Sequence, residues 1–199
     1  MSLQMPNLNG KALEFRWAIA PLDSCASFGE IPQSGRRKGE ARQMQQLTSI
    51  CQIYSDVGLS AIQSGDLKTA ETMFEAGVKE IERQKLRCSA ALALMRNLAL
   101  TYYRQRRLND AASILEKALK MTKQSPDASS RPEVALALAD IHFELGNRDM
   151  AEELYRKFLH KANLKAEVLR PRLKKYAFLL SEAGKIELAR QTLQLLQTG

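Results

Sequence analysis

The stretch that decides the fold is Leu92–Met121, LALMRNLALTYYRQRRLNDAASILEKALKM. Its first half carries apolar side chains at every third or fourth position from Leu92 to Tyr102, which is the spacing of one buried helix face. A polar break at Arg106-Arg107-Leu108 follows, and the second half then repeats the helical spacing. The stretch therefore predicts two antiparallel helices joined by a short turn.

Three further segments repeat this layout, and the four copies start 41, 40 and 38 residues apart. The copies cover Cys51–Ile81, Leu92–Met121, Pro132–Leu159 and Arg170–Leu196. Alignment places Ala70, Ala111, Ala151 and Ala189 in one slot, and Phe74, Leu115, Tyr155 and Leu193 four residues later. A fixed period of this size predicts a stacked array of helix pairs rather than a globule with a buried catalytic cleft.

The composition, with 45% hydrophobic and 26% charged residues, fits a soluble globular protein. A cytoplasmic location is the default expectation, because the sequence shows neither a membrane span nor a secretory signal. No apolar run reaches the roughly eighteen residues of a membrane span, and prolines and glycines interrupt any secretory signal layout. The three cysteines, Cys25, Cys51 and Cys88, have no metal-ligand spacing. The histidines, His142 and His160, lie on opposing helices of one pair, and no phosphate loop is present. We expect no enzyme, metal site or cofactor.

Residues 1–39 differ from the rest because prolines, glycines and serines break any long period. We expect a partly flexible extension that ends in the basic linker Gly35–Gly39, followed by a helical repeat domain over 40–199. Lys11–Ala20 could form a short strand or a helix, and could also dock in the repeat domain as a plug. Pro132 and Pro171 are expected in the first turn of their helices, where a missing N–H costs nothing.

The aligned slots resemble those of the tetratricopeptide repeat family, most clearly at Met95, Leu98-Ala99, Tyr102-Tyr103, Ala111, Leu115 and Ala118-Leu119. The resemblance implies an all-α, right-handed superhelical array of four antiparallel helix pairs, an α-solenoid. The usual period of the family is about 34 residues. The longer period here is similar to that of kinesin light chains and of the repeat domains of some bacterial transcription activators.

The resemblance also implies that the first helices of the pairs line a concave groove. The partner-binding positions that it indicates are Leu59, Arg96, Leu100, Tyr103, Arg104, Asp140, Phe143, Lys174 and Phe178. Apolar anchors mixed with Arg and Lys suit an extended or helical peptide that carries acidic residues. We therefore expect a non-catalytic scaffold for protein–protein interaction.

Chaperone-binding members of the family hold a C-terminal carboxylate with a set of Lys, Asn and Arg side chains. The matching positions here are Ser55, Leu59, Asn97, Glu133 and Ala137. Only Asn97 agrees, and Glu133 would repel a carboxylate. The groove is therefore not expected to bind a chaperone tail.

Two other functions remain open. The net charge of +8 is concentrated in 92–131 and 170–199, so a regulatory repeat domain could contact an acidic partner or nucleic acid through basic patches. Nucleic acid is disfavoured because few aromatics interleave with the basic residues. Alternatively, the last helix could pair with a second copy in a homodimer. Its apolar residues are Ile186, Leu188, Leu193, Leu195 and Leu196.

Overall fold

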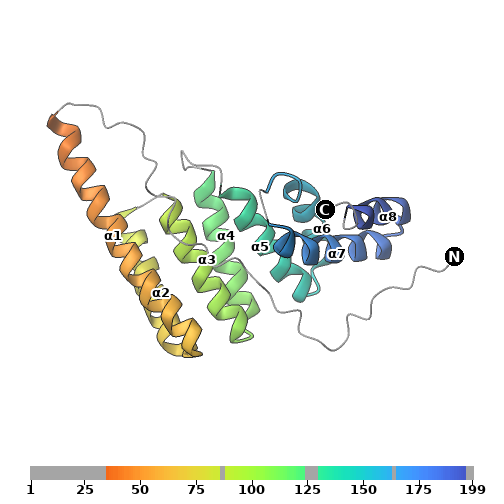
Figure 1. The fold of residues 1–199 in the computed structure, drawn as a ribbon, viewed down its shortest axis with the longest axis horizontal. Coiled ribbons are helices and arrows are strands. Elements are labelled where there is room, and N and C mark those ends of the chain that lie inside the picture. Colours follow the sequence, from red (N-terminus) through yellow and green to blue (C-terminus); the bar gives the residue numbers. More distant parts are fainter. Residues whose placement is uncertain (1–34, 86–87, 124–129, 163–164, 196–199) are drawn as a thin grey trace.

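The computed structural model describes residues 35–85, 88–123, 130–162 and 165–195, and within these ranges every regular element is an α-helix. The eight helices are α1 Gly35–Ser64, α2 Leu67–Gln84, α3 Ser89–Arg104, α4 Leu108–Thr122, α5 Arg131–Glu144, α6 Arg148–Phe158, α7 Ala166–Glu182 and α8 Ile186–Gln194 (Figure 1). The all-α array of helix pairs is confirmed. In the described part of the chain, none of these helices is long and apolar enough to cross a membrane.

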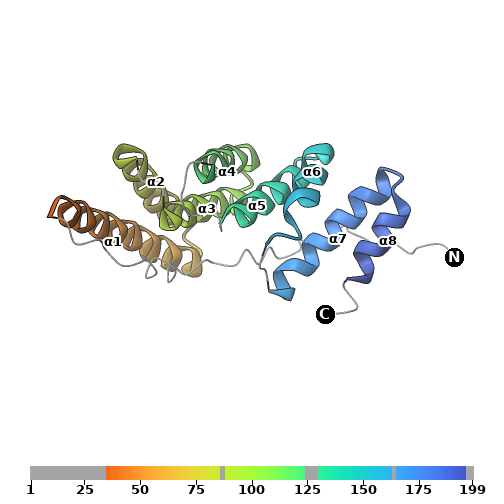
Figure 2. The same ribbon diagram turned by 90° about the horizontal axis from the view of Figure 1, so that it is seen from above.

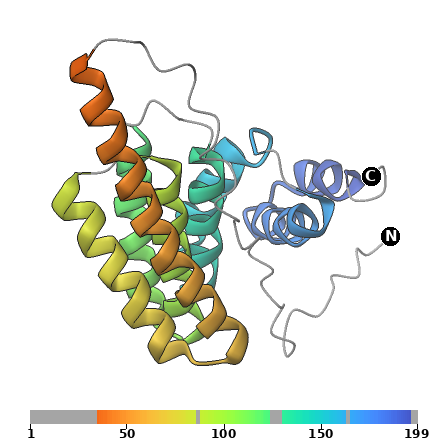
Figure 3. The same cartoon turned by 60° about the vertical axis from the view of Figure 1, so that its left-hand side comes forward.

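The helices pair in chain order and the pairs stack in chain order. We call α1, α3, α5 and α7 the first helices and α2, α4, α6 and α8 the second helices. In Figure 2, α2, α4 and α6 lie along one side of the stack, and α1, α3 and α5 lie along the other. The fourth pair has a different orientation from the first two pairs: the axes of α7 and α8 run across the direction of α1–α5 (Figures 1 and 3).

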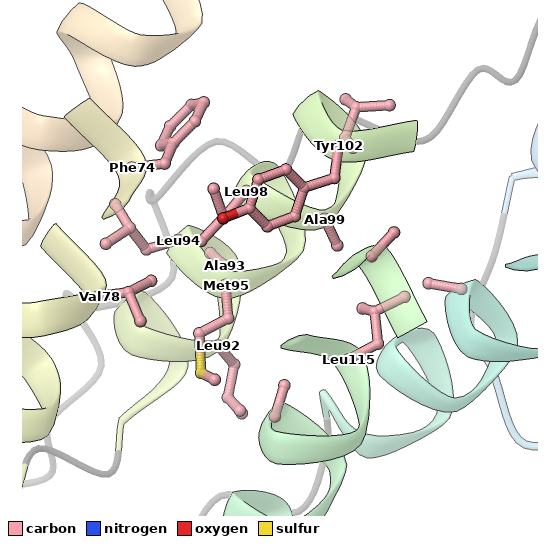
Figure 4. Packing of buried hydrophobic residues seen from close by; sticks show 14 of the residues in the cluster. Phe74, Val78, Leu92, Ala93, Leu94, Met95, Leu98, Ala99, Tyr102 and Leu115 are labelled. Carbon is pink, nitrogen blue, oxygen red and sulfur yellow. The ribbon is translucent and has the colours of Figure 1, made fainter. Parts of the chain in front are cut away.

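Small residues allow the helices to approach closely. The slot predicted from the alignment is buried in every pair, at Ala70, Ala111, Ala151 and Ala189. Gly58 of α1 shows why no larger residue fits, since a Cβ atom there would lie 2.5 Å from the ring of the buried Phe74 in α2. Figure 4 shows Phe74 on α2 beside the apolar side chains of α3, which join the first and second pairs in one core.

The turns inside the pairs share one backbone conformation. Gly65, Gly146 and Gly184 have φ angles of 81°, 77° and 74°, in the left-handed region that glycine adopts without steric cost. The second pair has Arg106 at the equivalent position, with φ of 64°. An L-residue in this conformation costs about 1–2 kcal/mol. The second turn therefore carries strain that the glycine-containing turns avoid.

Two local expectations are corrected. The basic stretch Gly35–Gly39 is helical and begins α1, because most of the residues around it favour helix, and Gly35 lies at the helix start. Pro171 lies inside α7, because the helix already begins at Ala166. Pro171 has no backbone N–H group and lies beyond the first turn, so α7 lacks one backbone hydrogen bond there. Pro132 lies in the first turn of α5, as expected. The predictions for Lys11–Ala20 and the rest of 1–34 fall outside the described residues.

Candidate functional site

Three partly buried aromatic side chains come from three consecutive first helices. Tyr103 lies on α3, Phe143 on α5 and Phe178 on α7. The rings of Phe143 and Phe178 meet edge to face, with centroids 6.0 Å apart and planes at 70°. Burial raises the pKa of Tyr103 to about 12, and the negative charges of Glu144 and Asp140 on α5 add to the shift. We call these three side chains the aromatic row.

Charged side chains and one further apolar side chain accompany the aromatic row. Arg104 and Lys174 are exposed on α3 and α7, whereas Leu59 on α1 is half-buried against the core. Arg96 differs from the other cations, because its Nη1 lies 2.5 Å from Oε2 of Glu133 on α5. Burial lowers the pKa of Arg96, and Glu133 opposes this shift. The charge of Arg96 is therefore balanced inside the array.

Two predicted groove residues are buried, which corrects their expected placement at the surface. Leu100 is 2% exposed and packs in the core of the first pairs, and Asp140 is 1% exposed. The family resemblance had indicated that both side chains line the concave groove. The stacking of neighbouring pairs covers them instead, and Arg172 of α7 covers Asp140. Neither side chain is available for direct contact with a partner.

Asp140 is the centre of a buried ionic cluster that joins α5, α6 and α7. The Tyr155 hydroxyl donates a hydrogen bond of 2.6 Å to Asp140 Oδ1, and Arg172 Nε donates one of 2.8 Å to Asp140 Oδ2. Lys175 Nζ lies 3.8 Å from Asp140 Oδ1 and donates to Glu144 Oε1 at 3.2 Å. We call these five side chains the α5–α7 ion network.

Burial makes the α5–α7 ion network unusual. Lys175 is 2% exposed, and lysine is almost never fully buried unless it is paired. Its ammonium group also lies 5.0 Å from the ring centroid of Phe143. Burial and the Asp140 carboxylate raise the pKa of Tyr155, so that the hydroxyl remains a donor. The network therefore fixes the fourth pair against the third, and its Lys175 also contacts Phe143 of the aromatic row.

Sequence reasoning missed this network, although the repeat register contained a signal. The sequence suggests that Arg172 and Lys175 belong to a basic cluster at the start of a helix. In the aligned copies Arg172 takes the position of Leu94 and Val134, and both of those residues are buried. A charged residue at a core position indicates a buried partner.

The last described helix leaves apolar side chains in contact with solvent. Ile186, Leu188 and Leu195 are exposed on or next to α8. Leu193 is half-buried and packs against Ala177, Leu180 and Ala189 of the fourth pair. Leu196 lies outside the described residues. The exposed apolar surface of α8 is therefore smaller than the sequence suggested.

Comparisons with known proteins agree with this architecture. A family model described as tetratricopeptide repeat matches residues 89–159, which contain α3 to α6. The fold is similar to that of BtubC (BKLC) from P. vanneervenii, with a TM-score of 0.65 and 16% sequence identity. The similarity covers 74% of this chain and 61% of that chain. No curated protein matches the sequence. Repeats of this type generally mediate protein–protein interaction and form non-catalytic scaffolds. Residues 89–159 therefore match tetratricopeptide-type repeats, and the first and last helix pairs continue the same helix-pair architecture.

Proposed function

We propose that the protein is a non-catalytic scaffold that binds an extended or helical segment of a partner protein along its first helices. The observation that carries the proposal is the aromatic row. Tyr103, Phe143 and Phe178 are partly exposed, and they come from the first helices of three successive pairs. Aromatic anchors of this kind supply most of the binding energy at protein interfaces.

The charges beside the aromatic row support an acidic partner. Arg104 and Lys174 are exposed, whereas Arg96 is already paired with Glu133. A carboxylate of the partner could therefore approach Arg104 or Lys174 without displacing an ion pair described here. Leu59 on α1 would extend the contact toward the first pair. Leu100 and Asp140 would act only through the packing beneath the surface.

A peptide selection experiment tests the proposal. The purified chain selects binders from a displayed random-peptide library, and fluorescence anisotropy then measures the affinity of the selected peptides. We expect peptides that contain acidic and apolar residues. The Tyr103→Ala variant and the Arg104→Gln/Lys174→Gln variant should each bind about tenfold more weakly, equivalent to about 1.4 kcal/mol.

The matched control is Lys120→Gln, because Lys120 is also exposed and, like Arg104, lies in the last turn of its helix. This variant should bind as tightly as the original chain. Equal affinity of all variants for the selected peptides would refute the assignment of the binding site. Circular dichroism spectra check that every variant is folded.

Self-association through α8 is a second candidate, supported by the exposure of Ile186, Leu188 and Leu195. Apolar side chains clustered on one surface indicate an interaction site more often than scattered ones do. The Ile186→Glu variant tests this candidate, because it should lower the average mass in solution if α8 mediates the contact. A mass that does not respond to Ile186→Glu would count against α8.

A further inference from the structure

The internal joints of the array show how one pair meets the next. Each second helix packs against the following first helix, as α2 packs against α3. Leu94 of α3 lies against α2 at Gly77, where an added Cβ atom would be 2.4 Å from Leu94 Cδ2. At these joints Leu94 and Leu98 are 0% and 1% exposed.

The first helix of the first pair carries the same kind of face. In the repeat register Ile53 takes the position of Leu94, and Val57 takes the position of Leu98. Ile53 is 62% exposed and Val57 is 44% exposed. Helix α1 thus has two exposed apolar side chains at the positions that, in α3, pack against α2.

Helix α8 presents the complementary side of such a joint. It is the second helix of its pair, and Ile186 takes the position of Leu67 in α2. The Leu67 carbonyl accepts a hydrogen bond of 3.4 Å from Gln105 Nε2 in the next pair, so this position faces the joint. Ile186 is 44% exposed, which leaves this side of α8 open to solvent.

The charges at the joints indicate which surface α8 fits. Arg107 Nη1 of the second pair lies 2.5 Å from Glu71 Oε1 of the first pair. Lys185 of the fourth pair contacts Glu152 of the third pair at the same two register positions. At these joints the second helix supplies the anion, and the cation belongs to the following pair.

On α8 the position of Glu71 is taken by Arg190, and in the first pair the position of Arg107 is taken by Asp66. Both residues are exposed. Arg190 forms an exposed ion pair of 3.2 Å with Glu187, and Asp66 Oδ1 accepts a hydrogen bond from Thr69 N. Among the four equivalent residues, Asp66, Arg107, Asn147 and Lys185, only Asp66 is opposite in charge to Arg190.

We propose that copies of this chain associate head to tail, with α8 of one copy packed on α1 of the next as α2 packs on α3. The proposal rests on the second candidate function, self-association through α8, and adds the surface that α8 meets. The two surfaces differ, so the contact is heterologous. Successive copies extend the stack, because the contact is not closed by a two-fold axis.

The average mass of the full chain in solution tests this proposal. Sedimentation equilibrium is measured from about 10 µM to 1 mM, the range in which weak contacts form. We expect the mass to rise above the 22.3 kDa of one chain and to pass the mass of a dimer without a plateau. Ile53→Glu/Val57→Glu should return the mass to that of one chain. Met150→Glu is the matched control, because Met150 is 50% exposed on α6, a helix that carries neither of the two surfaces.

A charge exchange between copies identifies the pairing directly. Arg190→Asp and Asp66→Arg should each weaken association at low salt, since each places like charges together. An equimolar mixture of the two variants should recover the association, because every contact in an alternating stack then joins opposite charges. Asp66→Arg also removes the helix cap at Thr69, and mixing cannot restore that cap. The recovery therefore reports on pairing between copies rather than on folding.

The outcomes separate the head-to-tail contact from the candidate on which it rests. A mass of one chain over the whole range overturns both. A dimer that Ile186→Glu dissociates and Ile53→Glu/Val57→Glu leaves intact overturns the head-to-tail contact and keeps the α8 candidate. A mixture of the charge variants that stays as dissociated as each variant alone also overturns the pairing of Arg190 with Asp66.

Discussion

Replacement of Asp140 by alanine tests how the fourth pair is held. The change leaves Arg172 and Lys175 buried, and it removes the carboxylate that accepts two hydrogen bonds of 2.6 and 2.8 Å. The removal of one partner from a buried ion pair costs about 3–5 kcal/mol, since the remaining charge stays out of water. The total stability of a domain is about 5–15 kcal/mol. Asp140→Ala should therefore remove a large part of the stability of the array.

Urea unfolding followed by far-UV circular dichroism measures the loss. With a slope of about 2 kcal/mol per molar urea, a loss of 3–5 kcal/mol lowers the midpoint by about 1.5–2.5 M. Each pair of an array contacts only its neighbours, so α7 and α8 should unfold first. The fluorescence of a dye attached near α8 would detect this early step.

Two variants make the interpretation specific. Glu133→Ala removes the partner of Arg96, but Glu133 is 38% exposed and water can partly replace its carboxylate, so we expect a smaller loss of about 1–3 kcal/mol. Replacing the four buried members of the network with apolar residues, as Asp140→Leu/Tyr155→Phe/Arg172→Leu/Lys175→Ala, should restore most of the stability. If Asp140→Ala costs no more than Glu133→Ala, the α5–α7 ion network does not hold the fourth pair.

Three other predictions concern single positions. Gly58→Ala should destabilise the protein by about 1–3 kcal/mol, because the new methyl group overlaps the buried ring of Phe74; an unchanged urea midpoint would contradict the close contact. Arg106→Gly should raise the stability by up to about 1 kcal/mol, since it relieves the left-handed strain and loses part of the gain to the entropy of the unfolded chain. Burial lowers the pKa of His142 from 6.5, although the charge of Glu116 opposes the shift. As the pH falls below 6.5, the unfolded chain therefore binds a proton that the folded chain resists, and the free energy of unfolding should decrease. His142→Leu should flatten this part of the pH profile, and an identical profile in the variant would assign the dependence to other groups.

The sequence predicted the architecture well because the packing between helices repeats. The alanine slot recurs in all four copies and the turn glycine in three of them, and their steric role requires no knowledge of distant contacts. Gly58 and Gly146, for example, follow from the close approach of two helices and from a left-handed turn. Local periodicity was sufficient to predict these features.

The site could be predicted only in part, because burial depends on the neighbouring pair. Asp140 and Leu100 lie on the side of the helix expected to face a partner, but both side chains are buried in the stacked array. Arg172 and Lys175 look like solvated charges in isolation. Their role depends on Asp140, which lies 32 residues before Arg172 and comes close only after the pairs stack. The residues next to Arg172 and Lys175 in the sequence therefore do not predict their contact with Asp140.

The α5–α7 ion network also bears on how such arrays change in length. Uniform repeats can be gained or lost by recombination, since any pair can follow any other. Here the loss of the third pair would bring α7 onto the second pair, where Leu100 takes the position of Asp140. Two buried cations would then face an apolar side chain. The junction between the third and fourth pairs is therefore specific to these two pairs, and we expect them to be gained or lost together.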